Sequence, residues 1–248
     1  MSWKIGLIGT GNVASFWAKN LISFPSIELF VKGRTPEASS IFSEKFNIQP
    51  LESQSVDCFL ICVQDRNIDH ILQTIDPGVP AFICAGLYSL KQSAHKTSGI
   101  IYPLQTIQIN AIPSFDEVPF LCEFPSNANS RACGLRFLTD FNLSYTETTE
   151  EARFTAHIAA VFINNFGYYT MKRGLSLAET KGLPADLFKP IIDKTIANLF
   201  IQGDLQTGPA RRNDLETMVK HQANLSGSSR ELYDFISNSI MKTYGNEL

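Results

Sequence analysis

The pattern of apolar and polar residues changes near residue 148. Before that point, short apolar runs recur between polar stretches that carry apolar residues at helical spacing. Such runs are typical of strands that are covered on both faces of a parallel sheet. They lie at residues 5–8, 27–31, 56–63, 80–86, 100–106, 118–123 and 143–146. Strands that alternate with helices, including helices at about 36–46 and 127–140, predict a doubly wound α/β domain over residues 1–148.

Beyond residue 148 the apolar residues recur every three or four positions, and no strand pattern is found. This spacing predicts a smaller all-helical domain over residues 149–248. Thr148 with Glu151, and Ser228 with Glu231, have the spacing of capping boxes, which mark helix starts. The expected helices cover a long stretch that stops at Gly182-Leu183-Pro184, then about 185–201, a stretch that ends near 224, and about 229–243.

The first apolar run ends in a glycine turn, after which apolar residues recur at helical spacing. The order strand, G-x-G-x-x-A, helix is an accepted form of the Rossmann dinucleotide-binding fingerprint. Gly9 permits the turn, Gly11 lets a pyrophosphate approach the backbone, and Ala14 lets the helix pack on the strand. The phosphates would bind the free N–H groups of the helix start. A purely structural turn is the alternative. The expected cofactor contacts are Gly9, Thr10, Gly11, Asn12, Val13 and Ala14.

The end of the second predicted strand indicates which cofactor would fit. In an NAD site, an acidic residue at this position holds the ribose 2′-hydroxyl. This chain instead carries Lys32, Arg34 and Thr35, which are donors suited to a 2′-phosphate. We therefore expect NADP, and a solvated loop is the alternative.

Two further strand ends offer candidate cofactor contacts, because doubly wound sheets bind ligands beyond the carboxyl ends of their strands. Val63, Gln64 and Asp65 follow one apolar run, and Ala85 follows the next. Asp65 fits equally well as the cap of the helix that comes after it.

Candidate catalytic groups lie on the long helix and at one strand end. Asn164 and Asn165 follow His157 by seven and eight positions, which places all three on one face of an α-helix. In a reductase, the imidazole would protonate the substrate as hydride arrives, and an amide would orient it. We favour Asn165, with Asn164 as the choice if the helix is rotated. Tyr102 and Gln105, where a strand emerges, are the candidates from the first domain. Polar groups satisfied within a helix interface are the alternative.

Composition narrows the function classes. The chain has 248 residues, of which 44% are hydrophobic, and a net charge of -3, so it suits a folded protein without a nucleic-acid surface. No apolar run approaches the roughly 20 residues of a membrane span, and we expect no signal peptide. The five cysteines lack metal-ligand spacing, and no metal site is predicted. Their default role is core packing, and a reducing cytoplasm fits them.

Several segments resemble the Rossmann-like NADP oxidoreductases that carry a C-terminal helical domain of unknown function. The similarity extends over nearly the whole chain, and more distantly to pyrroline-5-carboxylate reductases and deazaflavin-dependent NADP reductases. It implies NADP binding and often a dimer built on the helical domain. One departure is Ile83-Cys84-Ala85-Gly86, where relatives often carry histidine or hydroxyl residues before the glycine. The matching segments are Ile8–Ala14, Gly33–Thr35, Tyr102–Thr106, His157–Asn165 and Thr207–Ala210, with Arg212, Asp214 and His221.

The leading hypothesis is an NADP(H)-dependent oxidoreductase that transfers a hydride to or from a small carbonyl or imine substrate in the cleft between the two domains. A non-catalytic NADP-binding regulator or scaffold is the rival class. Thr207–Asp214 is a second polar cluster, whose loop Gly208–Asp214 would close such a cleft, and an N-cap at Asn213 or Asp214 is its structural alternative. Apolar residues around much of the long helix predict a two-fold homodimer.

Overall fold

The computed structural model describes residues 2–125 and 128–245. The chain forms two compact units, Met1–Asn164 and Asn165–Leu248. The expected domain boundary at residue 148 falls just before helix α5 (Glu150–Ala160), and it stays a prediction about which part folds independently. No helix in these described ranges is long and apolar enough to cross a lipid bilayer.

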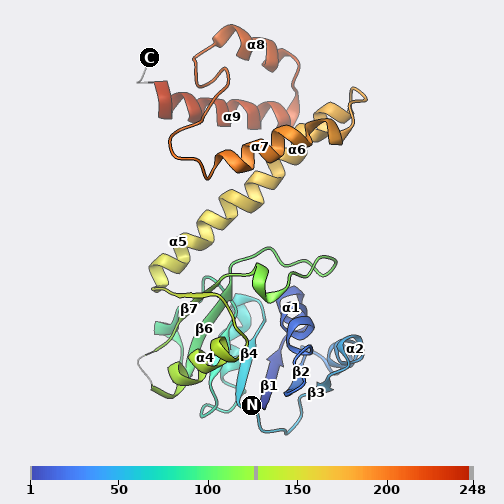
Figure 1. Ribbon diagram of the computed structural model, residues 1–248, viewed down its shortest axis with the longest axis vertical. Helices are drawn as coiled ribbons and strands as arrows, with labels where there is room; N and C mark the ends of the chain where they lie inside the picture. Colours follow the sequence, from blue (N-terminus) through green and yellow to red (C-terminus); the bar gives the residue numbers. More distant parts are fainter. Residues whose placement is uncertain (1, 126–127, 246–248) are drawn as a thin grey trace. The chain divides into compact units, whose positions relative to one another are not determined.

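The first unit is built on one sheet, to which the described residues contribute eight strands in the order β3-β2-β1-β4-β5-β6-β7-β8 (Figure 1). Neighbouring strands are parallel except for β6 and β7. This topology confirms the predicted α/β class, and all seven expected strands are present. The strands are β1 (Trp3–Ile8), β2 (Ile27–Lys32), β3 (Gln49–Pro50), β4 (Cys58–Ile61), β5 (Ala81–Ile83), β6 (Ser98–Pro103), β7 (Phe120–Glu123) and β8 (Tyr145–Glu147).

Helices cover both faces of this sheet. They are α1 (Asn12–Leu21), α2 (Pro36–Phe46), α3 (Ile68–Leu72) and α4 (Ala128–Asp140). α1, α2 and α4 pack into one apolar core, whereas α3 packs into a second. Because side chains alternate along a strand, Leu60 of β4 joins the first core and Ile61 joins the second. The expected start of α4 near residue 127 lies outside the described residues.

Short 3-10 turns fill several connections of the first unit. They are η1 (Asp65–Asn67), η2 (Leu90–Gln92) and η3 (Phe115–Glu117). The turn at η1 begins three residues after the carboxyl end of β4, and it continues into α3.

The second unit is helical throughout the part that is described, as the spacing of apolar residues predicts (Figure 1). A π-helical segment (Val161–Phe166) connects α5 to this unit. The helices that follow are α6 (Gly167–Glu179), the 3-10 turn η5 (Ala185–Phe188), α7 (Lys189–Asn198), α8 (Leu215–Ala223) and α9 (Gly227–Tyr244).

Two predicted capping boxes are wrong. The hydroxyl of Thr149, and not that of Thr148, accepts the N–H of Ala152 at 3.2 Å and caps α5. Thr148 donates its own N–H to β7 and so still belongs to the sheet. α9 begins at Gly227, which leaves Ser228 and Glu231 already inside the helix.

Gly9 fixes the passage from β1 into α1. Its φ is +121°, a conformation that side-chain-bearing residues rarely adopt. A Cβ at this position would lie 2.2 Å from the carbonyl oxygen of Cys62, at the end of β4. Only glycine therefore lets β1, β4 and α1 approach so closely.

We expect Gly9→Ala to lower the free energy of unfolding by roughly 2 kcal/mol or more, because the new methyl group meets a backbone oxygen and the conformation is strained. Urea unfolding, followed by the fluorescence of the buried Trp3 and Trp17, measures this change. Gly11→Ala is the matched control: its φ is -85° and nothing lies within 4 Å of an added Cβ. We expect that control to change stability by about 0.5 kcal/mol or less. An unchanged midpoint for Gly9→Ala would contradict the prediction.

Candidate functional site

The carboxyl ends of β1 and β4 form the topological switch point of the sheet. These strands are neighbours, and the helices that follow them, α1 and α3, pack on opposite faces. Ligands of open α/β sheets bind at such a point. The glycine turn and the segment that starts at Val63 are therefore the two sides of the expected cofactor position.

The glycine turn has the features of an anion site. Gly11 is the N-cap residue of α1, and no side chain caps the helix or places an acid in its first turn. Gly11 is exposed, and nothing lies within 4 Å of a Cβ built on it. Ala14 is fully buried against the sheet, while the side chain of Asn12 donates to the carbonyl of Ile107 at 3.1 Å. The first N–H groups of α1 thus remain available for a phosphate.

The residues expected at a 2′-phosphate lie beside this turn. A Cβ on Gly33 would be 3.1 Å from Cγ2 of Thr10, so the loop after β2 contacts the glycine turn. Lys32 and Arg34 are exposed, and neither side chain has a hydrogen bond or ion pair with another described residue. Thr35 is engaged, because its hydroxyl caps α2 by accepting the N–H of Ala38 at 3.2 Å. Lys32 and Arg34 are consequently the two donors left without a partner among the described residues, and the planar guanidinium of Arg34 suits a phosphate better.

The other expected cofactor contacts lie at the same edge of the sheet. Val63 is half-buried and Gln64 is exposed after β4, whereas Ala85 is buried after β5. Asp65 is exposed and is the first residue of η1, whose N-cap is Gln64. The alternative role of Asp65 as a helix cap is therefore wrong. Its carboxylate instead raises the pKa of Tyr102.

Tyr102 and His157 form the central polar pair of the first unit. The Tyr102 hydroxyl lies 3.0 Å from Nδ1 of His157, and both residues are half-buried. Burial raises the pKa of Tyr102, and the nearby Asp65 carboxylate raises it further, whereas the Arg153 guanidinium acts in the opposite direction. Tyr102 is therefore a neutral phenol at physiological pH, and its hydroxyl is held against the imidazole of His157.

Gly86 packs between the two members of this pair. A Cβ at Gly86 would lie 2.9 Å from Cζ of Tyr102 and 3.1 Å from Nδ1 of His157. The loop after β5, which also carries Ala85, thus packs against the rings of both Tyr102 and His157. A larger residue at position 86 would separate them.

The amides expected beside His157 do not lie in regular α-helix. Asn164 and Asn165 are exposed and lie in the π-helical segment. A π turn holds more residues than an α turn, so the α-helical spacing that put them on the face of His157 does not apply. The side chain of Gln105 is exposed and is engaged within its own loop, where it donates to the carbonyl of Glu117 at 3.1 Å and accepts the N–H of Thr106 at 2.8 Å.

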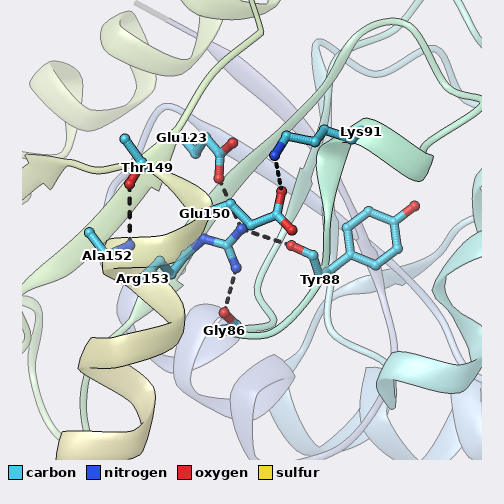
Figure 2. Close-up of polar contacts among 8 residues, drawn as sticks. All are labelled: Gly86, Tyr88, Lys91, Glu123, Thr149, Glu150, Ala152 and Arg153. Atoms are coloured by element: carbon cyan, nitrogen blue, oxygen red, sulfur yellow. Dashed lines mark hydrogen bonds and ion pairs between the residues drawn. The ribbon is translucent and has the colours of Figure 1, made fainter.

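Arg153, which sequence analysis did not select, is fully buried next to this pair. Its guanidinium donates to the carbonyl oxygens of Gly86 and Tyr88 and to the carboxylate of Glu123 (Figure 2). The available signal was a cation one helical turn before His157 on the same face. A cavity of 210 Å³ opens here, lined in part by Gly86, Arg153 and Phe154.

The second polar cluster lies entirely in the second unit. Asp214 caps α8 by accepting the N–H of Thr217 at 3.1 Å. Of the two expected caps, Asn213 and Asp214, it is therefore the second that caps the helix. Nδ1 of His221 lies 3.0 Å from the Tyr233 hydroxyl. Gly208 has a φ of +103°, which glycine adopts without strain.

Comparison with known proteins places this geometry in context. A domain of unknown function, DUF2520, matches residues 118–240. A Bacteroides fragilis protein provisionally named an NADP oxidoreductase is 24% identical, with a TM-score of 0.81 over 97% of this chain and 98% of that one. A 1-pyrroline-5-carboxylate reductase from Streptococcus pyogenes is 16% identical, with a TM-score of 0.64 over 98% of both chains. An imine reductase from a Pseudomonas species is 13% identical, with a TM-score of 0.70 over 99% and 95%.

These similarities confirm the resemblance predicted from the sequence and the fold class. At such identities the common feature is the fold, a Rossmann-type sheet followed by a helical region, and the named activities belong to the compared proteins. No curated protein matches the sequence.

Proposed function

We propose that the protein is an NADP(H)-dependent oxidoreductase that transfers a hydride to or from a small carbonyl or imine compound. The observation that carries this proposal is that an open glycine turn and a Tyr102–His157 pair are built on the carboxyl ends of the same sheet. The first feature suits a dinucleotide, and the second suits proton transfer.

The residues present fit the phosphates of the cofactor. The N–H groups at the start of α1 and the open space over Gly11 suit the pyrophosphate. Arg34 suits the 2′-phosphate, because its guanidinium is exposed, always charged and without a partner among the described residues. Gln64, Asp65 and Ala85 follow the strands toward which the nicotinamide would extend.

The bound nicotinamide would supply or accept the hydride, and the chain's own residues would handle the proton. The raised pKa of Tyr102 keeps its hydroxyl protonated. In its protonated form His157 would donate the Nδ1 proton to the Tyr102 hydroxyl, 3.0 Å away, and give the Nε2 proton to the substrate oxygen or nitrogen; the ring would then be neutral and would take a proton back from water. Asn165 is retained as a candidate for orienting the substrate.

The substrate class is supported by the compared proteins. Two of them, the 1-pyrroline-5-carboxylate reductase and the imine reductase, are named for compounds with a carbon–nitrogen double bond. Reduction of a C=N or C=O bond consumes one hydride and one proton, which matches a dinucleotide site beside a proton donor. We therefore place small imines before other carbonyl compounds as test substrates.

The helical unit supports a homodimer. Several large apolar side chains of this unit are between 64% and 88% exposed: Tyr168, Ile191, Leu199, Phe200 and Phe235. Monomeric soluble proteins rarely expose so much apolar surface, and a unit of this size cannot bury it internally. A second copy of the chain, related by a two-fold axis, would cover it. We also assign the protein to the cytoplasm.

We expect Arg34→Ala to weaken NADPH binding by roughly ten-fold or more and to leave NADH binding almost unchanged, because a charge-assisted hydrogen bond is worth about 1.5–3 kcal/mol. Titration calorimetry measures both affinities. Arg131→Ala is the matched control, since Arg131 of α4 is paired with Glu147 of β8. Equal affinities of the native protein for the two cofactors would contradict the choice of NADP.

We expect His157→Ala to lower kcat by roughly 100-fold or more without changing NADPH affinity, because the imidazole acts on the substrate and not on the phosphates. NADPH oxidation against a panel of cyclic imines and keto acids measures kcat. His70→Ala, an exposed residue of α3, is the control. Tight NADPH binding without turnover of any compound would instead favour a non-catalytic NADP-binding protein.

We expect the native protein to be a dimer at micromolar concentration and Phe200→Glu to shift it toward monomer, because the change places a charge on an exposed apolar surface of the helical unit. Light scattering measures the mass. Ile41→Glu changes an exposed apolar residue of α2 in the first unit and should leave the dimer intact. A native protein that is only monomeric would rule out this assembly.

A further inference from the structure

Arg153 is unusual because it is fully buried, and no other Arg, Lys, Asp or Glu among the described residues is. Burying a charge is costly unless the group is paired and hydrogen-bonded. Arg153 meets this condition through an ion pair with Glu123, whose carboxylate oxygen lies 2.9 Å from Nη2. A guanidinium that is buried here despite its desolvation cost indicates a specific role for Arg153.

The contacts of Arg153 join three separate pieces of the chain (Figure 2). Nη1 donates to the carbonyl oxygen of Gly86, and Nη2 donates to that of Tyr88 at 2.8 Å, both in the loop after β5. Glu123 is the last residue of β7, and Arg153 itself lies in the second turn of α5. Only the planar fork of a guanidinium presents several donors in fixed directions, so a lysine cannot reproduce this arrangement.

The loop that Arg153 holds is the one that supports the polar pair. A Cβ built on Gly86 would lie within 3.1 Å of both Tyr102 and His157, and His157 follows Arg153 by one turn of the same helix. The guanidinium therefore fixes the loop and the helix relative to each other. The 3.0 Å separation of the Tyr102 hydroxyl from Nδ1 of His157 depends on both.

We propose that Arg153 is a positioning residue that sets the geometry of the Tyr102–His157 pair through the Gly86–Tyr88 loop. This inference rests on the proposed oxidoreductase function, in which that pair handles the substrate proton. Arg153 does not reach the substrate itself, because its Nη groups are occupied by the two carbonyls and by Glu123.

The charge of Arg153 provides a readout that a merely structural contact would lack. The guanidinium lowers the pKa of Tyr102, against burial and the Asp65 carboxylate, which raise it. Removing the cation should therefore raise this pKa. Neutralising Glu123 should lower it, because the cation is then less compensated. The two charge variants should shift the same phenol in opposite directions.

The experiment uses four variants of the full chain: Arg153→Met, Arg153→Lys, Glu123→Gln and, as control, Arg131→Met. Arg131 is also an arginine paired with a glutamate, but it lies on α4 and takes no part in this loop. The Tyr102 phenol is titrated by carbon NMR at Cζ, with Tyr102→Phe identifying its signal among the seven tyrosines. Titration is done without cofactor or substrate, and kcat and NADPH affinity are measured separately.

We expect opposite pKa shifts in Arg153→Met and Glu123→Gln and none in Arg131→Met. Arg153→Lys keeps the charge but loses the fork, so it should keep the Tyr102 pKa closer to native while kcat falls roughly 10- to 100-fold at unchanged NADPH affinity. A Tyr102 pKa that is the same in both charge variants as in the native protein, or full turnover in Arg153→Lys, would overturn the proposal. If Arg153→Met does not fold, the other two variants still decide.

Failure of this inference and failure of the proposed function give different results. A native protein that binds no NADPH and turns over no substrate overturns the oxidoreductase function, whatever the phenol titration shows. An active native protein whose Tyr102 titration does not respond to Arg153 or Glu123 overturns the positioning role alone.

Discussion

The close approach of the Gly9 backbone to the carbonyl of Cys62 is the constraint on which the first unit depends. It allows β1 to end and α1 to begin while β1 stays paired with β4. The helices after these two strands can then cover opposite faces of the sheet. The N–H groups of α1 and the segment that begins at Val63 leave the sheet at this point, and the loop that carries Gly86 follows the next strand, β5. Backbone geometry thus decides where the site lies before any reactive side chain contributes.

Much of the fold could be predicted because its elements have local signals. Seven strands followed from short apolar runs, but β3 has none: Gln49 and Pro50 join the sheet only through backbone pairing with β2. Helix starts were harder, because adjacent threonines at 148 and 149 both suit a cap and only the sheet pairing of the first one decides between them. The π-helical segment was not predicted, since apolar spacing resembles an α-helix on either side of it.

The candidate site was only partly accessible to sequence reasoning. Tyr102 and His157 were selected one at a time for their chemistry, but their contact spans 55 positions and exists only in the folded chain. Gly86 carries no chemical signal, because its importance is the space that a side chain would take from two rings. Arg153 looked like any helix-surface cation, and its burial depends on carbonyl groups of a loop 65 to 67 residues away.

The two edge strands of the sheet also affect whether the protein aggregates in concentrated solution. At one edge β3 is only two residues long, and Pro50 has no N–H to offer. At the other edge β8 is three residues long, and its last residue, Glu147, is held in an ion pair with Arg131. Short, charged and proline-bearing edges resist the addition of a foreign strand. A sheet of this width is therefore protected from edge-to-edge aggregation by the very strands that carry the weakest hydrophobic signal.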